Sequence, residues 1–262
     1  MKIAVCIKQV PDTNKVEVDP VTGVLKRNGV DSKMNPYDLY ALETALRLKE
    51  QYGGEVRVIT MGPPQAEAVI YEAFSMGVDD GYLITDRAFA GADVLATSRA
   101  ISQGLKKSGE FDIIICGKQS TDGDTAQVGP EISEYLSLSS VTNVTEIISA
   151  DAKSITVKRT LPLAVETVKL AFPCLISVEK DIYIPRLPSY LKKQATKDRK
   201  ITLFTLGDFD DTDPMHYGLN GSPTQVQRIF PPEVNDKREM WQGESGEIVS
   251  KFAGKLKELK FI

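Results

Sequence analysis

The chain has 262 residues, of which 42% are hydrophobic and 26% are charged, and its formal net charge is −4 at pH 7. This length allows one large domain, or one domain with an extension, and the composition is that of an ordinary soluble globular protein. The slightly negative charge argues against a nucleic-acid-binding protein, because no strongly basic face dominates.

The sequence contains no run of about 18 apolar residues, so neither a transmembrane helix nor membrane insertion is expected. The opening MKIAVCIKQVP lacks the longer apolar segment and the cleavage site of a secretory signal, and its pattern suits a strand. A cytoplasmic location is therefore expected.

Cysteine and histidine are scarce. Cys6, Cys116 and Cys174 are far apart and form no C-x-x-C pair, so buried, inert thiols are expected. The single histidine, His216, lies in a loop flanked by Pro and Gly. A metal site or a Cys–His catalytic pair is not expected, and any redox chemistry must come from a bound cofactor.

The first 140 residues alternate strand-like and helix-like segments. Asn35 is a good helix N-cap, Pro36 fits the first helical position, and Asp38 adds negative charge to the first turn. This order predicts an α/β fold whose mostly parallel sheet carries helices on both faces. Strands are expected over 3–10, 55–62, 81–85 and 111–117, helices over 36–52, 63–77, 91–109 and 126–138, and a small hairpin over 16–27.

The character of the chain changes after residue 140. Four β-like runs follow without intervening helices and should add strands and antiparallel ribbons to the same sheet or its edge. A basic stretch, a turn-rich loop or linker and an amphipathic helix complete the chain, at 187–200, 207–223 and 244–262. The pattern leaves open whether this last helix folds back on the core or pairs with another subunit.

The sequence GKQSTDGDTAQVG, residues 117–129, follows a buried strand and precedes a helix. Ligands of open parallel sheets bind outside the carboxyl ends of the strands, and a helix N-terminus suits a phosphate. Gly123 would let the main chain approach a ligand, and Thr125 offers a hydroxyl. Asp122 and Asp124 have a simpler alternative role, as an Asx turn and a helix N-cap. The loop is not a Walker A motif, and no G-x-G-x-x-G follows the first strand.

Over nearly its whole length the chain resembles the β subunits of electron transfer flavoproteins. Four segments occur in the order and at the spacing of that family: KIAVCIKQVPDT, MNPYDLYALETALRLKE, VITMGPPQAEAVIYEAFSMGVDDG and CGKQSTDGDTAQVGPEI. The resemblance implies a Rossmann-like, doubly wound subunit that works as a heterodimer with an FAD-carrying α subunit. Residues 1–205 would be the nucleotide- or flavin-binding domain, and residues 206–262 an extension whose helix contacts the α subunit.

The resemblance also implies a nucleotide site at the strand ends. The start of the helix at Ala92 to Thr97 would flank the flavin end of the ligand. One departure is QST at 119–121, where the family more often has Q-A-I. The implied ligand contacts are Cys6 (through its backbone), Asn35, Pro36, Tyr37, Asp38, Met61, Thr97, Gly117, Lys118, Gln119, Ser120, Thr121, Asp122, Gly123, Asp124, Thr125, Ala126, Gln127 and Val128.

Two segments, TDGDTAQVGPEI and DRAFAGADVLATS, resemble the electron-bifurcating branch of the family, in which a second FAD replaces AMP. In that branch the FAD takes a hydride from NADH. One electron passes to ferredoxin or flavodoxin, and the other passes through the α-subunit FAD to an acyl-CoA dehydrogenase-type partner. The segment from Pro185 to Leu191 matches the loop that docks on the dehydrogenase, with Tyr190 and Leu191 as apolar anchors.

Two alternatives are weighed against this reading. One is a non-bifurcating electron carrier whose β subunit binds AMP as a structural element, and the small residues Gly123 and Thr125 favour FAD over it. The other is an ATP-hydrolysing or adenylating enzyme of related fold. That enzyme class would need an S-G-G-x-D-S-type loop where this chain has KQVPDT.

Overall fold

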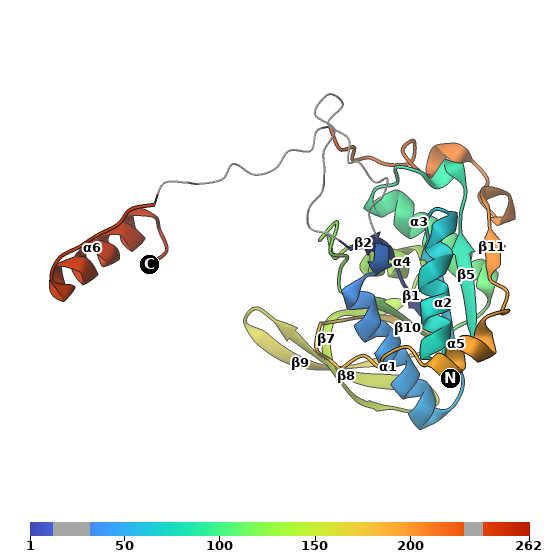
Figure 1. Ribbon diagram of the computed structural model, residues 1–262. Coiled ribbons are helices and arrows are strands. Elements are labelled where there is room, and N and C mark those ends of the chain that lie inside the picture. The colour runs from blue at the N-terminus through green and yellow to red at the C-terminus, as the bar shows by residue number, and fades with distance from the viewer. Residues whose placement is uncertain (13–31, 228–237) are drawn as a thin grey trace. The chain divides into compact units, whose positions relative to one another are not determined.

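The computed structural model describes residues 1–12, 32–227 and 238–262 (Figure 1). The hairpin predicted over 16–27 lies outside the described residues. The described chain divides into two compact units, residues 1–12 with 32–227 and residues 238–262, and each is considered by itself. Among the described residues, no helix is both long enough and apolar enough to span a membrane.

The first unit is built on one large sheet. Its described strands are β1 (Lys2–Cys6), β4 (Glu55–Met61), β5 (Asp80–Ile84), β6 (Ile113–Gly117), β7 (Ser139–Ala150), β8 (Ser154–Leu161), β9 (Ala164–Ala171), β10 (Cys174–Val178) and β11 (Thr202–Phe204), while β2 (Gln9–Pro11) and β3 (Ser32–Met34) form a separate pair. Its helices are α1 (Pro36–Tyr52), α2 (Glu67–Met76), α3 (Val94–Ser108), α4 (Val128–Leu136) and α5 (Tyr190–Thr196), with short 3₁₀ turns η1 (Pro64–Ala66), η2 (Arg87–Phe89), η3 (Leu206–Asp208) and η4 (Pro214–His216).

The nine strands of this sheet run in the order β11-β5-β4-β1-β6-β10-β7-β8-β9. All pairs from β11 to β7 are parallel, and β8 and β9 extend the sheet as an antiparallel ribbon. The predicted fold, a mostly parallel sheet with an added antiparallel portion, is confirmed.

Helices cover both faces of the sheet because alternate side chains of each strand point to opposite faces. In β1, Ile3 and Val5 join a core with Leu42 of α1. The intervening Ala4 and Cys6 join a second core, to which Ala100 of α3 and Ile132 of α4 also belong. The continuous apolar runs of the sequence are therefore strands buried on both sides.

The single strand expected over 3–10 is wrong. β1 ends at Cys6, and the chain leaves the sheet after the amide of Ile7 bonds the carbonyl of Ile59 at 3.0 Å. The next amide, that of Lys8, bonds a side-chain carboxylate instead of a strand. Gln9–Pro11 then forms β2, which pairs antiparallel with β3.

Residues 207–223 are a packed loop and not a linker. Phe209 and Tyr217 are buried, and each ring centroid lies 5.5 Å from that of Phe89. The compact unit accordingly continues to Gln227. The functional division expected after residue 205 stays a prediction.

The second unit contains the predicted C-terminal helix, α6 (Ser245–Glu258). Trp241 packs edge-on against Phe252, with ring centroids 6.4 Å apart, and the Lys251 ammonium lies 5.1 Å from the Trp241 ring centroid. No residue of α6 is buried. Its apolar side chains are thus available to another surface.

Candidate nucleotide-binding site

The order of the parallel strands reverses between β1 and β6. From β1 the chain proceeds to β4 and β5 on one side, and β6 and β10 lie on the other. Cys6 and Cys116 are paired in register near the carboxyl ends of these two strands. Such a switch point is where open α/β sheets bind ligands. The predicted loop, residues 117–128, begins there.

Asp38 connects the two strand ends at the switch point. It lies in the first turn of α1, is buried, and accepts the Lys8 amide at 2.8 Å and the Gly117 amide. Burial raises the pKa of Asp38 to about 7, although the hydrogen bonds that its carboxylate receives oppose that rise. The Asp38 side chain therefore links α1 to the ends of β1 and β6, in addition to complementing the helix dipole.

Asn35 occupies the N-cap position of α1, as predicted, but its side chain makes no capping hydrogen bond. Its Nδ2 donates to the carbonyl of Gln119 at 2.9 Å, and its Oδ1 accepts the amide of Thr121 at 3.2 Å. The expected cap is thus replaced by two bonds that fix the start of the loop.

Neither aspartate of the loop caps the following helix. Both Asp122 oxygens accept from Lys8 Nζ, at 2.7 and 2.8 Å, and Asp124 Oδ1 accepts from Gln119 Nε2 at 2.8 Å. The N-cap of α4 is Gln127, whose side chain makes no capping bond. Burial opposes ionisation of Asp122, but the hydrogen bond and charge of Lys8 outweigh it and lower the pKa of that carboxyl.

The main chain of the loop turns at two residues other than glycine. Asp124 and Ala126 have φ values of 51° and 55°, in the left-handed region, whereas Gly123 does not. Packing requires glycine at Gly117, where a Cβ would lie 2.5 Å from Asp38 Oδ1 and 2.7 Å from the carbonyl carbon of Tyr37. Gly117 is therefore the position of closest approach between the loop and α1.

The loop leads into the N-terminus of α4. The first amides of a helix have no intrahelical partner, and the helix dipole adds partial positive charge. The Lys8 ammonium, paired with the Asp122 carboxylate, adds a cationic group that contacts the loop. Together these groups are suited to the phosphate of a nucleotide.

The remaining predicted contacts lie on neighbouring elements. Met61 ends β4, beside β1. Thr97 is half-buried on α3, where the adjacent Ser98 donates to the carbonyl of Val128 at 3.4 Å. A cavity of about 330 Å³ lies between α3 and residues 215–223, and Leu95 and Ala96, from the helix start predicted to flank the flavin end, line it.

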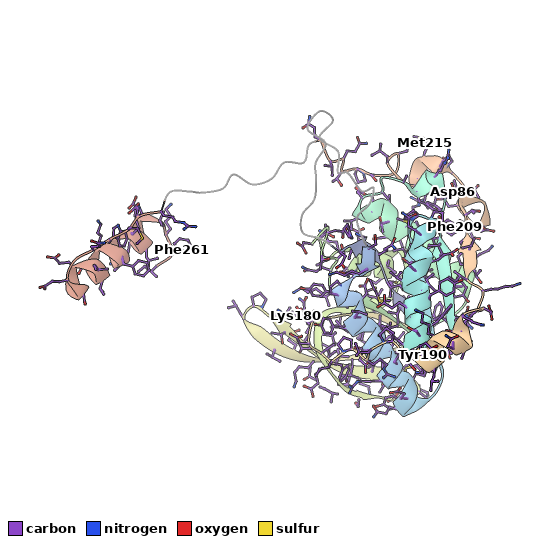
Figure 2. The ribbon with its side chains drawn as sticks, viewed as in Figure 1. Asp86, Lys180, Tyr190, Phe209, Met215 and Phe261 are labelled. Atoms are coloured by element: carbon purple, nitrogen blue, oxygen red, sulfur yellow. The ribbon has the colours of Figure 1, made fainter. Side chains whose placement is uncertain are left out.

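Tyr190 and Leu191 lie apart from this site. They start α5, which packs on α2 near the amino ends of the strands (Figures 1 and 2). The sheet thus presents the predicted nucleotide site and the predicted docking residues at opposite edges.

The predicted buried thiols are confirmed, since all three cysteines are free and buried. A hydrogen bond with Cys6 and burial raise the pKa of Cys116, and burial raises the pKa of Cys174 to about 12. Cys116 and Cys174 are therefore poor nucleophiles at neutral pH.

Lys8 is a site residue that sequence reasoning missed. Its Nζ reaches Asp122 and, at 3.4 Å, Ser120 Oγ in the loop. The available signal was its position directly after the first strand, where parallel sheets gather their functional side chains.

Comparison with known proteins identifies the family. The sequence profile of the electron transfer flavoprotein domain matches residues 22–208. The chain belongs to the electron transfer flavoprotein family, and its similarity to β subunits extends over the full length.

Three relatives illustrate this similarity. The electron transfer flavoprotein subunit beta of Clostridium acetobutylicum is 44% identical over 262 residues, which cover 100% of both chains. The caffeyl-CoA reductase-Etf complex subunit CarD of Acetobacterium woodii is 43% identical over 264 residues, again covering 100% of both. Protein FixA of Azorhizobium caulinodans is 42% identical over 244 residues, covering 91% of this chain and 87% of that protein.

Proposed function

We propose that residues 117–128 of this electron transfer flavoprotein β subunit bind FAD and that the subunit takes part in NADH-dependent electron bifurcation. The observation that carries the proposal is the course of the loop. Asp124 and Ala126 turn its main chain at the start of α4, beside the switch point of the sheet. Successive amides in such a turn can cradle phosphate oxygens, and the donors for a ligand would be the amides that follow Asp124, because those of Gly123 and Asp124 donate to the carbonyl of Ser120.

The residues present fit a dinucleotide. A pyrophosphate needs more room and more donors than a single phosphate, and residues 121–125 are exposed and mostly small. Thr125 supplies a hydroxyl, and Lys8 a cation that Asp122 orients at 2.7 Å. The absence of a side chain at Gly123 and the small side chain of Ala126 leave room that favours FAD over AMP.

When bound, FAD would supply the redox chemistry, taking a hydride from NADH and passing one electron to ferredoxin or flavodoxin and the other to the α-subunit FAD. This chain's own residues would bind and position it, and we expect no side-chain catalyst. Asp38, through the amides of Lys8 and Gly117, would hold the two strand ends at the separation that the ligand requires.

The proposed setting is a cytoplasmic heterodimer with an electron transfer flavoprotein α subunit. We further propose an acyl-CoA dehydrogenase-type protein as the final electron acceptor, docking at Tyr190 and Leu191. The Acetobacterium woodii relative is named as a subunit of a caffeyl-CoA reductase-Etf complex, which supports a CoA-ester reductase as partner.

The direct test is the flavin and AMP content of the chain purified with its α partner. Two FAD per heterodimer and no AMP are expected. One FAD with one AMP would mean a simple electron carrier and would overturn the proposed reading of the loop.

A further inference from the structure

Large apolar side chains are exposed along the segment that follows β10 and enters the first turn of α5. Ile184 and Leu187 are each 87% exposed, Leu191 is 79% exposed, and Tyr190 is 73% exposed (Figure 2 labels Tyr190). Exposed clusters of this kind mark surfaces that contact other proteins. We call residues 184–191 the exposed segment.

One face of α1 holds the chain that leads into the exposed segment. The contacts come from positions 40, 43, 47 and 50, which recur at the spacing of a single helix face. Tyr40 donates its hydroxyl to Asp181 at 3.2 Å. The guanidinium of Arg47 lies over the ring of Tyr183, 4.5 Å from its centroid.

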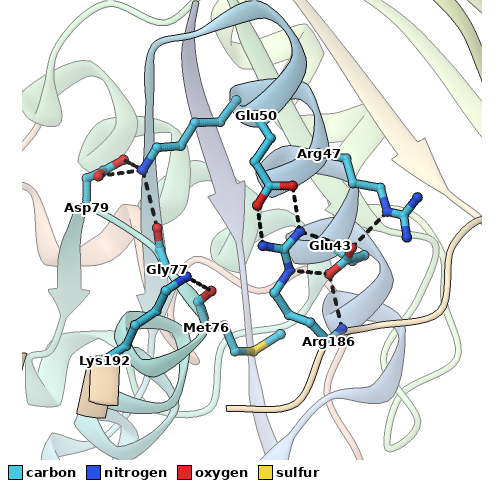
Figure 3. Close-up of polar contacts among 9 residues, drawn as sticks. Glu43, Arg47, Glu50, Met76, Gly77, Asp79, Arg186 and Lys192 are labelled. Carbon is cyan, nitrogen blue, oxygen red and sulfur yellow. Dashed lines mark hydrogen bonds and ion pairs between the residues drawn. The ribbon is translucent and has the colours of Figure 1, made fainter. Parts of the chain in front are cut away.

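Arg186 makes the strongest of these connections (Figure 3). Its guanidinium donates to Glu43 at 2.8 and 3.2 Å and to Glu50 at 2.5 and 3.1 Å, so both pairs are bidentate. Its backbone amide also donates to Glu43, at 3.1 Å. Both the side chain and the main chain of Arg186 are therefore fixed on α1.

Glu43 makes this attachment costly to break. The residue is only 2% exposed. Burial opposes its ionisation, but hydrogen bonds from Arg186 and Arg47 outweigh burial and lower its pKa. Loss of the Arg186 guanidinium would leave a buried carboxylate with the Arg47 side chain as its remaining cationic partner.

The other end of the exposed segment is held by α2. The amide of Ser189 donates to the carbonyl of Ser75 at 2.9 Å, and Lys192 Nζ donates to the carbonyl of Met76 at 3.1 Å (Figure 3 shows the second bond). The segment is thus fixed at both ends while its apolar side chains stay exposed.

We infer that Arg186 is a positioning residue that orders the exposed segment for docking by the acyl-CoA dehydrogenase-type partner. The inference rests on the proposed function. A surface that is already ordered loses less conformational entropy on binding. The adjoining α5 and the residue after it carry Lys193 and Lys197, whereas Lys192 is bound to Met76, so the matching partner surface is an apolar pocket with an acidic rim.

The experiment uses the heterodimer and a purified acyl-CoA dehydrogenase as acceptor. Arg186→Gln is compared with Tyr190→Ala, which removes an apolar anchor, and with Arg159→Gln. The control breaks a similar arginine–glutamate pair, Arg159 with Glu166 at 2.7 Å on the β8–β9 ribbon. Hydrogen exchange over 181–193 and the KM and kcat for the dehydrogenase are measured for each variant.

Arg186→Gln should speed hydrogen exchange in the segment and raise KM by about tenfold, about 1.4 kcal/mol of docking free energy, with kcat unchanged. Arg186→Lys should recover little of the loss, because an ammonium cannot make two bidentate pairs. Glu50→Gln is the milder variant should Arg186→Gln fold poorly, and should shift both measurements in the same direction. Tyr190→Ala should raise KM without changing exchange, and Arg159→Gln should change neither.

Unchanged exchange in both Arg186→Gln and Glu50→Gln would overturn the inference. Faster exchange with an unchanged KM would also overturn it, because order in the segment would then be irrelevant to docking. An unchanged KM for Tyr190→Ala would refute docking at this surface and this inference together, while the flavin proposal would still be decided by cofactor content.

Discussion

At the scale of single residues, Gly117 and Gly123 have different roles. Gly117 lies against the main chain of Tyr37 and the carboxylate of Asp38, where a Cβ has no room. Gly123 is exposed, and a Cβ there would meet Ser120 Oγ at 3.3 Å, a contact that the hydroxyl can relieve by rotating. The first glycine serves the packing of the site, and the second serves the space available to a ligand.

Gly117→Ala should therefore destabilise the subunit by about 1–3 kcal/mol, because its methyl group forces the loop away from α1. Chemical denaturation of the variant measures this loss. Gly123→Ala is the matched control and should unfold within about 0.5 kcal/mol of the unmodified chain. Equal stability of the two variants would contradict the role assigned to Gly117.

Gly123→Asp tests whether the space at Gly123 accommodates a ligand. A carboxylate at this position should crowd and repel a pyrophosphate, so the heterodimer should lose the FAD proposed for this subunit while keeping its fold. The measurement is flavin content per heterodimer together with the unfolding midpoint. Full flavin content in the variant would contradict the proposed geometry.

At the scale of elements, Asp38 joins α1 to the ends of β1 and β6. Its carboxylate is buried where it accepts the amides of Lys8 and Gly117. Burial raises its pKa from 3.8 to about 7, so the native state binds a proton more tightly than the unfolded chain. This group therefore stabilises the fold less as pH rises from about 4 to about 7.

Asp38→Asn should remove that dependence. The free energy of unfolding of the unmodified chain minus that of the variant should fall by about 2.5 kcal/mol between pH 5 and pH 8. Urea unfolding at the two pH values gives the difference. Asp122→Asn is the control: the pKa of Asp122 is lowered, so its contribution is lost only under more acidic conditions and should be constant over this range.

The type and order of most elements followed from the sequence, since hydrophobic periodicity distinguishes strands from helices, but the short elements β2, β3, β11 and α5 were not predicted. The position of the loop at 117–128, beside the switch point of the sheet, also followed, because parallel strands end at one edge; that it binds a nucleotide stays a prediction. Contacts between residues far apart in the sequence could not be predicted from it. Asn35 has the composition and place of an N-cap, yet its partners Gln119 and Thr121 are more than 80 residues away. The end of β1 at Cys6 likewise depends on Asp38, which local pattern does not reveal.

At the scale of the whole molecule, the two compact units differ in how they are stabilised. The described cores of the first unit lie between its sheet and its helices, and they include no residue of α6. The second unit contains the single tryptophan of the chain, Trp241. That residue is therefore a natural reporter for the second unit.

The emission of Trp241 should change when the α subunit is added, if α6 contacts that subunit as proposed. In the isolated β subunit, the change in Trp241 emission should not coincide with the loss of far-UV circular dichroism during urea unfolding. The emission reports on the second unit, whereas most of the helices and strands lie in the first, and non-coincident transitions indicate units that unfold separately. Trp241→Phe provides the background signal. Coincident transitions would show that the two units unfold as one.

The contacts at the two ends of α1 fix the distance between two parts of the subunit. Asp38 at one end contacts the candidate nucleotide site and Glu50 near the other end holds the exposed segment, roughly 18 Å apart at 1.5 Å per residue. A residue inserted between them would rotate one set of contacts by about 100° relative to the other. Insertions and deletions within α1 should accordingly disrupt one of the two sets of contacts, because the length of this helix matches both.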